Sequence, residues 1–366
     1  MSTEIRPKSS VGDKHTRFFS GLFLLMHGHP LSSNDVQQCL RIATAGTIGF
    51  AICKTFNWNY GVFFTASPIL LVGLVPVFNG HIARQFILAA MINSVEVGII
   101  AGFFSHMPVV MTILAFILFF FRFRLISNGP LLLFGISGVV SISIMFHLAS
   151  YPGTDLHDML MSNIVSTWLA VIIAVFVHYV FPDTELRAIP YRAEKSHERS
   201  LHESLLGAFL ATLSFLVFQV LNLHDSLSAQ MASIFVILPL HYRAIITAAR
   251  WRILGVIIGC VFGLLIQLLL YTNFHILFFI LPLLWIGFML GAKMHVTEKV
   301  GSGVGFNVMS TMAILFGQYL QPGQDLVYND LYRISSVIVS LLITLAAVYV
   351  IHTLLNLFPA TRFRPD

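Results

Sequence analysis

Long apolar stretches alternate with short polar breaks along most of the chain. A helix needs about 20 mostly apolar residues to cross the hydrocarbon layer of a bilayer. Twelve stretches meet this requirement within the usual error of such boundaries, and 109–124 and 228–243 are the shortest of them. The predicted helices are 36–56, 60–79, 84–105, 109–124, 129–149, 158–181, 203–222, 228–243, 250–271, 274–292, 301–320 and 330–357. The pattern predicts an all-α fold, a polytopic membrane protein with about twelve transmembrane helices.

The composition supports a membrane protein and excludes a soluble one. Hydrophobic residues make up 57% of the chain and charged residues only 10%, whereas roughly 25% of an ordinary soluble domain is charged. The net charge of +5 does not indicate nucleic-acid binding, because the basic residues are scattered at the ends of apolar stretches. Cys39, Cys53 and Cys260 lack paired spacing, and the histidines lack the spacing of a helical metal pair. We therefore expect no disulfide, metal or cofactor.

The basic residues also predict how the helices are oriented. With a cytoplasmic N-terminus, only Lys54 and Arg333 of the 21 Lys and Arg residues would face outward. Cytoplasmic loops carry an excess of Lys and Arg, so this distribution agrees with the predicted helix count. We expect both termini and the polar linker to be cytoplasmic, and residues 18–26 to form a helix in the membrane interface.

Two motifs of the first half return in the second half. Pro-Gly-x-Asp-Leu at 152–156 returns at 322–326, a shift of 170 residues, and Ala-Arg-x-x-Ile-Leu at 83–88 returns at 249–254, a shift of 166. Six helices in each half would give two parallel copies, related by an axis along the membrane normal. The predicted organisation is an N-terminal segment, a first six-helix repeat, a linker, a second six-helix repeat and a tail: 1–35, 36–182, 183–202, 203–358 and 359–366.

One segment of the second half carries a family resemblance. Pro239 is followed by Arg252-x-x-Gly255-x-x-x-Gly259 at the start of a helix. This pattern resembles the fusaric acid resistance and aromatic acid exporter superfamily. The first half keeps an eroded version, with Leu88 and Ala89 where small residues or glycine would be expected. The chain is similar to a compact bacterial branch of that superfamily, because its short linker replaces the exporters' large cytoplasmic domain.

The resemblance implies a function in efflux. It implies export of small organic acids, including aromatic ones, or of drugs across the bacterial inner membrane, often with a periplasmic membrane-fusion adaptor. The sequence lacks the phosphate loop Gly-x-x-x-x-Gly-Lys-[Ser/Thr], which favours a secondary transporter over an ATP-driven one. Proton coupling is expected through the carboxyl group of Glu96, described next. The main alternative is a non-transporting scaffold of an envelope complex, and an enzyme is not expected. The oligomeric state stays open.

Glu96 is the first candidate for a functional site. It is the only acid deep inside a predicted helix, and Asn93 lies one turn below it. Ionisable groups at this depth are costly and are therefore candidates for proton or substrate pathways. The alternative is a structural hydrogen bond between helices.

A second candidate lies at the start of the predicted helix 250–271. Arg250 and Arg252 would stand at its cytoplasmic mouth, where they would attract anionic substrates or anchor in lipid headgroups. The glycines that follow, Gly255, Gly259 and Gly263, lie on one face of the helix. Such a row predicts close packing against another helix.

Two predicted outer loops are acidic. Asp155 and Asp158 lie in one of them, and Asp325 and Asp330 lie in the matching loop of the second half. These carboxylates would form a docking surface for an adaptor or would cap the helices that follow, and capping is favoured for Asp158 and Asp330.

The orientation gives a testable prediction. A reporter fused after residue 190 is expected in the cytoplasm, and a cysteine at Ser150 is expected to react with an impermeant maleimide from outside, because an even number of helices separates 190 from the N-terminus. Labelling of residue 190 from the periplasm would contradict the twelve-helix topology.

Overall fold

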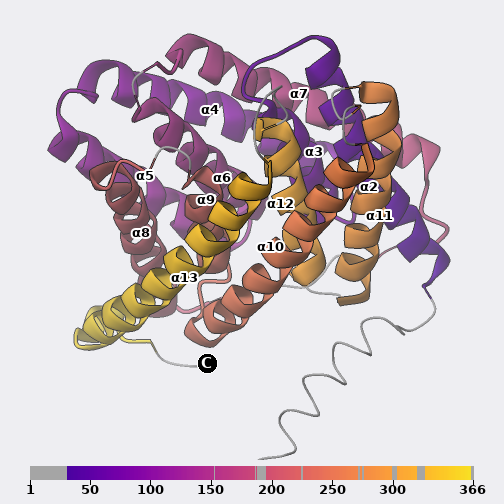
Figure 1. The fold of residues 1–366 in the computed structure, drawn as a ribbon. Coiled ribbons are helices and arrows are strands. Elements are labelled where there is room, and N and C mark those ends of the chain that lie inside the picture. The colour runs from indigo at the N-terminus through magenta and orange to yellow at the C-terminus, as the bar shows by residue number, and fades with distance from the viewer. Residues whose placement is uncertain are drawn as a thin grey trace, which may run out of the picture.

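The computed structural model describes residues 31–151, 153–185, 187, 195–223, 226–270, 273, 276–298, 303–319 and 326–363, without the side chains of 318–319 and 326–330. These residues form an all-α bundle (Figure 1), as predicted. Its helices are α2 (Ser33–Thr55), α3 (Gly61–Leu74), α4 (Gly80–Phe104), α5 (Pro108–Asn128), α6 (Leu132–Ala149), α7 (Leu156–Val180), α8 (His197–Val220), α9 (Leu227–Ile237), α10 (Tyr242–Leu270), α11 (Leu277–Glu298), α12 (Val304–Tyr319) and α13 (Leu326–Asn356). The predicted interfacial helix 18–26 lies outside the described residues.

The helices differ in their ability to cross a bilayer. Eight of the described helices are long and apolar enough to do so: α4, α5, α6, α7, α8, α10, α11 and α13. The helices α3, α9 and α12 are apolar but shorter. The chain is therefore a multi-pass membrane protein, whereas a full count of twelve crossings stays a prediction.

The short α9 differs most from its predicted range, 228–243. It ends at Ile237, and Leu240, just beyond it, has a φ of 61°. Pro239 lacks an amide proton, and a branched residue at positive φ cannot continue a right-handed helix. With 11 residues, α9 is about 16 Å long, too short to cross the roughly 30 Å hydrocarbon layer alone. The predicted crossing would have to be completed by backbone that is buried in protein.

The same helix pairs form contacts in both halves. In the first half α3 packs on α2 and α7, α4 packs on α6 and α7, and α5 packs on α6. Moving every label on by six gives the second half, in which α9 packs on α8 and α13, α10 packs on α12 and α13, and α11 packs on α12. The contacts between halves correspond as well, because α5 packs on α8 as α11 does on α2, and α6 packs on α9 as α12 does on α3. Thus α3, α6, α9 and α12 form the centre of the bundle.

Glycines allow the closest approaches between these helices. A Cβ atom at Gly61 would lie 2.3 Å from the carbonyl oxygen of Gly317, so the backbones of α3 and α12 touch where the halves meet. The predicted glycine row of α10 lies against α12 in the structure. Gly255, Gly259 and Gly263 face Asn307, Thr311 and Leu315, respectively.

Ion pairs hold the segments between α7 and α8. Asp183 pairs with Arg41 of α2 and Arg187. Glu203, which is buried, accepts from Lys195 at 2.5 Å and from Ser127 of α5 at 2.7 Å. The helix α8 begins at His197, inside the predicted linker 183–202. Glu203 therefore lies within α8, whereas the predicted boundary had placed it at the start of the helix.

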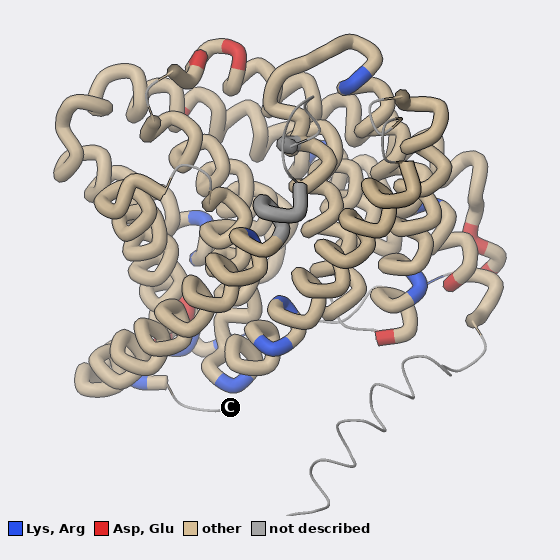
Figure 2. The backbone as a smooth tube through the Cα atoms, viewed as in Figure 1, with Lys and Arg blue, Asp and Glu red and all other residues tan. Residues whose placement is uncertain are grey.

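The charged residues are distributed unevenly over the bundle. Figure 2 shows most Lys and Arg in the part of the bundle toward the described C-terminal end, away from the turn between α6 and α7. This asymmetry agrees with the predicted orientation, and the assignment of that end to the cytoplasm stays a prediction.

Replacing Gly61 by alanine is expected to destabilise the contact between the halves. The new methyl group would overlap the carbonyl of Gly317, and overpacking of this kind costs about 1–3 kcal/mol. The free energy of unfolding in mixed detergent micelles measures the effect. Gly102→Ala is the matched control, because its Cβ would meet nothing closer than 3.9 Å. Equal stability of the two variants would contradict the backbone contact.

Candidate functional site

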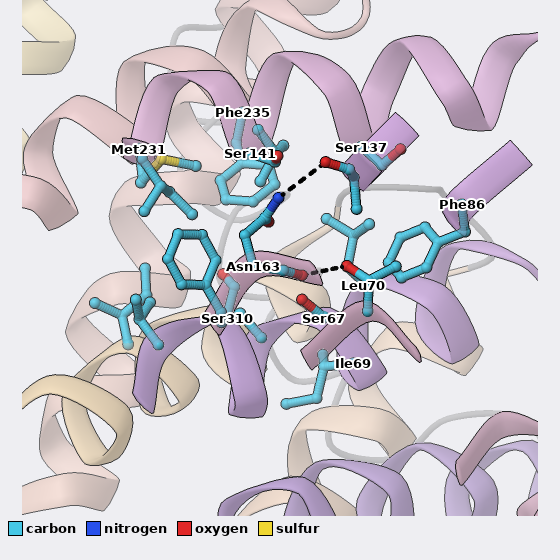
Figure 3. Close-up of a pocket in the computed structure, with 18 of the residues that line it drawn as sticks. Ser67, Ile69, Leu70, Phe86, Ser137, Ser141, Asn163, Met231, Phe235 and Ser310 are labelled. Atoms are coloured by element: carbon cyan, nitrogen blue, oxygen red, sulfur yellow. Dashed lines mark hydrogen bonds between the residues drawn. The ribbon is translucent and has the colours of Figure 1, made fainter. Parts of the chain in front are cut away.

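A cavity lies between the two halves, at the centre of the bundle. We call it the inner cavity, and its polar lining residues are Ser67, Ser137, Ser141, Asn163, Thr167 and Ser310. They come from α3, α6, α7 and α12, and Figure 3 shows Asn163 and Ser310 among apolar side chains that include Phe86, Met231 and Phe235. The volume open to the centres of water-sized spheres is about 50 Å³. A cavity of about 150 Å³ is known to hold benzene, so this one has room for a few waters but not for an aromatic ring.

A wider space, the vestibule, adjoins the inner cavity where α9 ends and α10 begins. Its volume on the same scale is about 510 Å³. It is lined by Leu74, Ile136, Leu238, Pro239, Arg243, Ala244, Thr247, Ala248 and Trp251, together with Phe235 and Phe306. Both halves therefore contribute to the vestibule, as they do to the inner cavity.

Two phenylalanines separate the vestibule from the inner cavity. Phe235 of α9 and Phe306 of α12 line both spaces. Their ring centroids are 5.9 Å apart and their planes are at 76°, the edge-to-face arrangement that aromatic pairs prefer. The ring of His295 lies 5.8 Å from Phe306, and its Nε2 atom lies 2.9 Å from the carbonyl oxygen of Gly73. The pair therefore lies between the two spaces, and we call it the aromatic barrier.

Arg252 lies behind this barrier and is buried. Its Nη1 atom donates to Oδ1 of Asn307 at 2.9 Å and to Oγ of Ser310 at 2.6 Å, and its guanidinium carbon lies 5.1 Å from the centroid of Phe235. Within the described part of the chain no Asp or Glu pairs with Arg252, its Nε atom has no hydrogen-bond partner, and Arg333 repels it. Since Ser310 lines the inner cavity, a positive charge without an acidic partner among the described residues stands one hydrogen bond from that cavity.

The two arginines predicted at the helix mouth therefore have different environments. Arg250 is exposed at the surface of α10, whereas Arg252 is only 1% exposed. The pattern of apolar positions could not separate them, because they are two residues apart at the edge of an apolar stretch.

Glu96 does not stand alone in the structure. It forms an ion pair with Arg122 of α5, whose Nη2 atom also donates to Oδ1 of Asn93 at 2.9 Å. Arg122 is buried, although the sequence placed it at a cytoplasmic helix end. A cation–π contact with Phe134, at 5.0 Å, completes its surroundings. The sequence analysis identified Glu96 as a candidate but did not identify its ion-pair partner, Arg122.

Glu96 and Asn93 lie next to the inner cavity without lining it. The Nδ2 atom of Asn93 is 3.4 Å from Oγ of Ser141, which lines the cavity from α6. Three hydrogen bonds therefore join Glu96 through Arg122 and Asn93 to Ser141.

The acidic loop before α7 has a structural role. The side chain of Asp155 accepts from the backbone N–H of Asp158 at 3.0 Å and caps α7. Asp158 instead accepts from Asn59 at 2.7 Å. The cap is thus Asp155, and the prediction that Asp158 caps the helix is wrong. The side chains of Asp325 and Asp330 lie outside the described residues.

Two family models match the chain, one in each half. Residues 210–347 match a family described as fusaric acid resistance protein-like. Residues 38–177 match a family described as a protein of unknown function, DUF2955. Among curated proteins and solved structures, no match was found. The resemblance expected from the sequence is confirmed, and with the apolar helices it indicates a membrane transporter-like protein.

The ion pair of Glu96 gives a prediction for stability. Arg122→Leu removes the donor of both Glu96 and Asn93. Loss of one partner of a buried pair costs about 3–5 kcal/mol, and we expect the lower end of that range because the Glu96 side chain is 28% exposed. Glu96→Gln removes the charge that balances Arg122 but keeps an oxygen that accepts from the guanidinium, so it is expected to cost less, about 1.5–3 kcal/mol. Unfolding in mixed detergent micelles measures both values.

Arg124→Leu is the control on the same helix. Arg124 makes an exposed contact with His197 at 3.2 Å, and such surface contacts contribute about 0–1 kcal/mol. A loss of stability in Arg124→Leu as large as that in Arg122→Leu would show that replacing either arginine of α5 by leucine is destabilising. The loss in Arg122→Leu could then not be assigned to the ion pair with Glu96.

Proposed function

We propose that the protein is a secondary transporter of the bacterial inner membrane that exports small organic acids from the cytoplasm. The observation that carries the proposal is Arg252, a buried guanidinium group without an acidic partner in the described chain, beside a path between the halves. Charges at membrane depth are costly and are kept where they bind or conduct. A carboxylate in the inner cavity would supply the missing negative charge, and an aromatic ring would pack on the apolar wall.

The proposed path starts at the vestibule, on the cytoplasmic side. Arg243 at its wall would attract an anion. Phe235 and Phe306 would then separate to admit the acid to the inner cavity, which must widen because its present volume is about 50 Å³. The structure corresponds in this scheme to a state closed at the aromatic barrier.

We infer that the halves are parallel repeats that rock against each other. The recurring helix pairs support this inference. The short helices α3 and α9 are each second in their half, and interrupted helices at matching positions mark binding sites in transporters of repeated architecture. A rotation of about 180° around the membrane normal would superpose the halves.

Proton coupling would run through Glu96. Its ion pair with Arg122 would have to open for the carboxylate to take up a proton, and Asn93 would pass that movement to Ser141 of the cavity wall. The outer face would leave room for a membrane-fusion adaptor as a further partner. A scaffold without transport activity is the alternative that the following experiment tests.

Arg252→Gln is expected to lower counterflow of benzoate in proteoliposomes at least about tenfold, because one charge-assisted hydrogen bond contributes about 1.5–3 kcal/mol. Arg252→Lys keeps the charge and is expected to retain more of the activity. Arg250→Gln, on the exposed side of the same helix, is the matched control and is expected to stay within roughly twofold of the unchanged protein.

Size-exclusion profiles and thermal unfolding show whether each variant is folded. Equal losses in folded Arg250→Gln and Arg252→Gln would contradict a role of the buried guanidinium. Absence of counterflow in the unchanged protein for every carboxylate tried would favour the scaffold.

A further inference from the structure

A second open space lies in the second half of the chain, apart from the path between the halves. It is a groove bounded by α8, α9 and α13, and we call it the hydroxyl groove. Its volume, on the scale used above, is about 270 Å³, and it shares no lining residue with the inner cavity or the vestibule. Leu213, Val339 and Ile343 line it and are 37%, 54% and 50% exposed, so its rim lies on the lipid-facing surface of two apolar helices.

Sequence differences explain why this groove is open here. In the first half, α2 packs closely on α3, because Gly49 of α2 lies where a Cβ atom would come within 2.3 Å of the Phe64 carbonyl oxygen. In the second half, α8 packs on α9. The one glycine of α8 is Gly207, which lies against Phe123 of α5 and not against α9. Without glycine on the side toward α9 and α13, α8 cannot approach as closely, and the space stays unfilled.

One wall of the groove carries a ladder of hydroxyl groups. Oγ of Ser233 lies 2.7 Å from Oγ of Ser340 and accepts from Thr344 at 2.9 Å, and Ser226 pairs with Tyr332 at 2.7 Å. These groups satisfy one another within the described chain, and each hydroxyl oxygen keeps a further lone pair. A guest in the groove therefore meets acceptors at fixed positions.

The opposite wall carries one hydroxyl that is not satisfied. Ser214 of α8 lines the groove and is 9% exposed, and its Oγ atom has no hydrogen-bond partner among the described groups. A buried hydroxyl without a partner costs about 1–3 kcal/mol. A guest with one hydrogen-bonding group would remove that cost.

We infer that the hydroxyl groove binds an uncharged single-ring compound with one hydroxyl group, a phenol, which enters from the bilayer. None of the described residues that line the groove carries a charge, so an ion would lose its hydration without compensation. The volume exceeds the roughly 150 Å³ that holds benzene and leaves room for a short alkyl substituent. This inference does not depend on the proposed transport of acids.

Photolabelling of the full-length protein in phosphatidylcholine nanodiscs tests the inference. The probe is a para-alkylphenol with a diazirine in its alkyl chain, and labelled peptides are located by mass spectrometry. Saturable labelling of α8 and α13 beside the groove is expected. Excess 4-propylphenol is expected to abolish it, whereas 4-propylbenzenesulfonate, which has a similar size and a charge, is expected to compete at least tenfold more weakly.

Three variants separate the groove from the general lipid surface. Ser214→Leu fills the groove and is expected to abolish saturable labelling. Ser214→Ala removes only the hydroxyl and is expected to weaken binding roughly 2- to 10-fold. Thr212→Val removes another buried hydroxyl of α8 that does not line the groove, and no change is expected.

Three results would overturn the site or its chemistry. Labelling that does not saturate, or that persists unchanged in folded Ser214→Leu, would show that the groove is covered by lipid and has no specific binding site. Equal competition by the sulfonate would exclude an uncharged ligand as the preferred occupant. If Ser214→Leu does not fold, the competition series and Ser214→Ala still decide the question.

Discussion

A guanidinium group cannot be buried among apolar helices unless polar groups gather round its five N–H donors and its permanent charge. Arg122 and Arg252 impose this constraint on the two halves of the bundle. Arg122 draws Asn93 and Glu96 of α4 toward α5, and a Cβ atom at Gly138 of α6 would lie 2.8 Å from its side chain. Asn93 and Glu96 thus satisfy the hydrogen-bond donors and the charge of Arg122 in the apolar interior.

The two arginines differ in their charge balance. Arg122 has a carboxylate partner, whereas Arg252 has the amide oxygen of Asn307, a hydroxyl and the face of a phenylalanine ring. Among the described residues, the second half therefore places a positive charge without an acidic partner next to the inner cavity, whereas the first half places an ion pair there, even though the helix pairs of the two halves correspond. Similar backbone arrangements thus carry different electrostatics, which is what a transporter needs if one half binds the substrate and the other handles the coupling ion.

The fold was largely predictable because hydropathy reports directly on helices that face lipid. The early end of α9 was harder, since Pro239 lies within an apolar run and the positive φ of Leu240 leaves no trace in composition. Glu203 was not recognised as a buried acid, because the predicted helix began at residue 203 whereas α8 begins at His197. Among 33 phenylalanines, nothing in the sequence distinguishes Phe235 and Phe306, which form the barrier, from those that face lipid.

The candidate residues were harder to predict than the helices, because burial depends on neighbours that are distant in sequence. Glu96 was correctly noticed as an acid in an apolar run, but its partner Arg122 lies on another helix and was counted among the basic ends. The charge count that predicts topology treats every arginine near a helix end as solvated, and Arg122 and Arg252 are both buried.

The contact between Gly61 and Gly317 has a mechanical consequence. No side chain separates the backbones of α3 and α12 at this point, so the contact fixes how closely these two helices approach each other. If the halves rock against each other as proposed, this contact would be the pivot, because the two backbones are closest there. A compound designed to arrest that motion would then gain little at the pivot, and would do better as a wedge at a distance from it, where the same tilt moves the helices furthest.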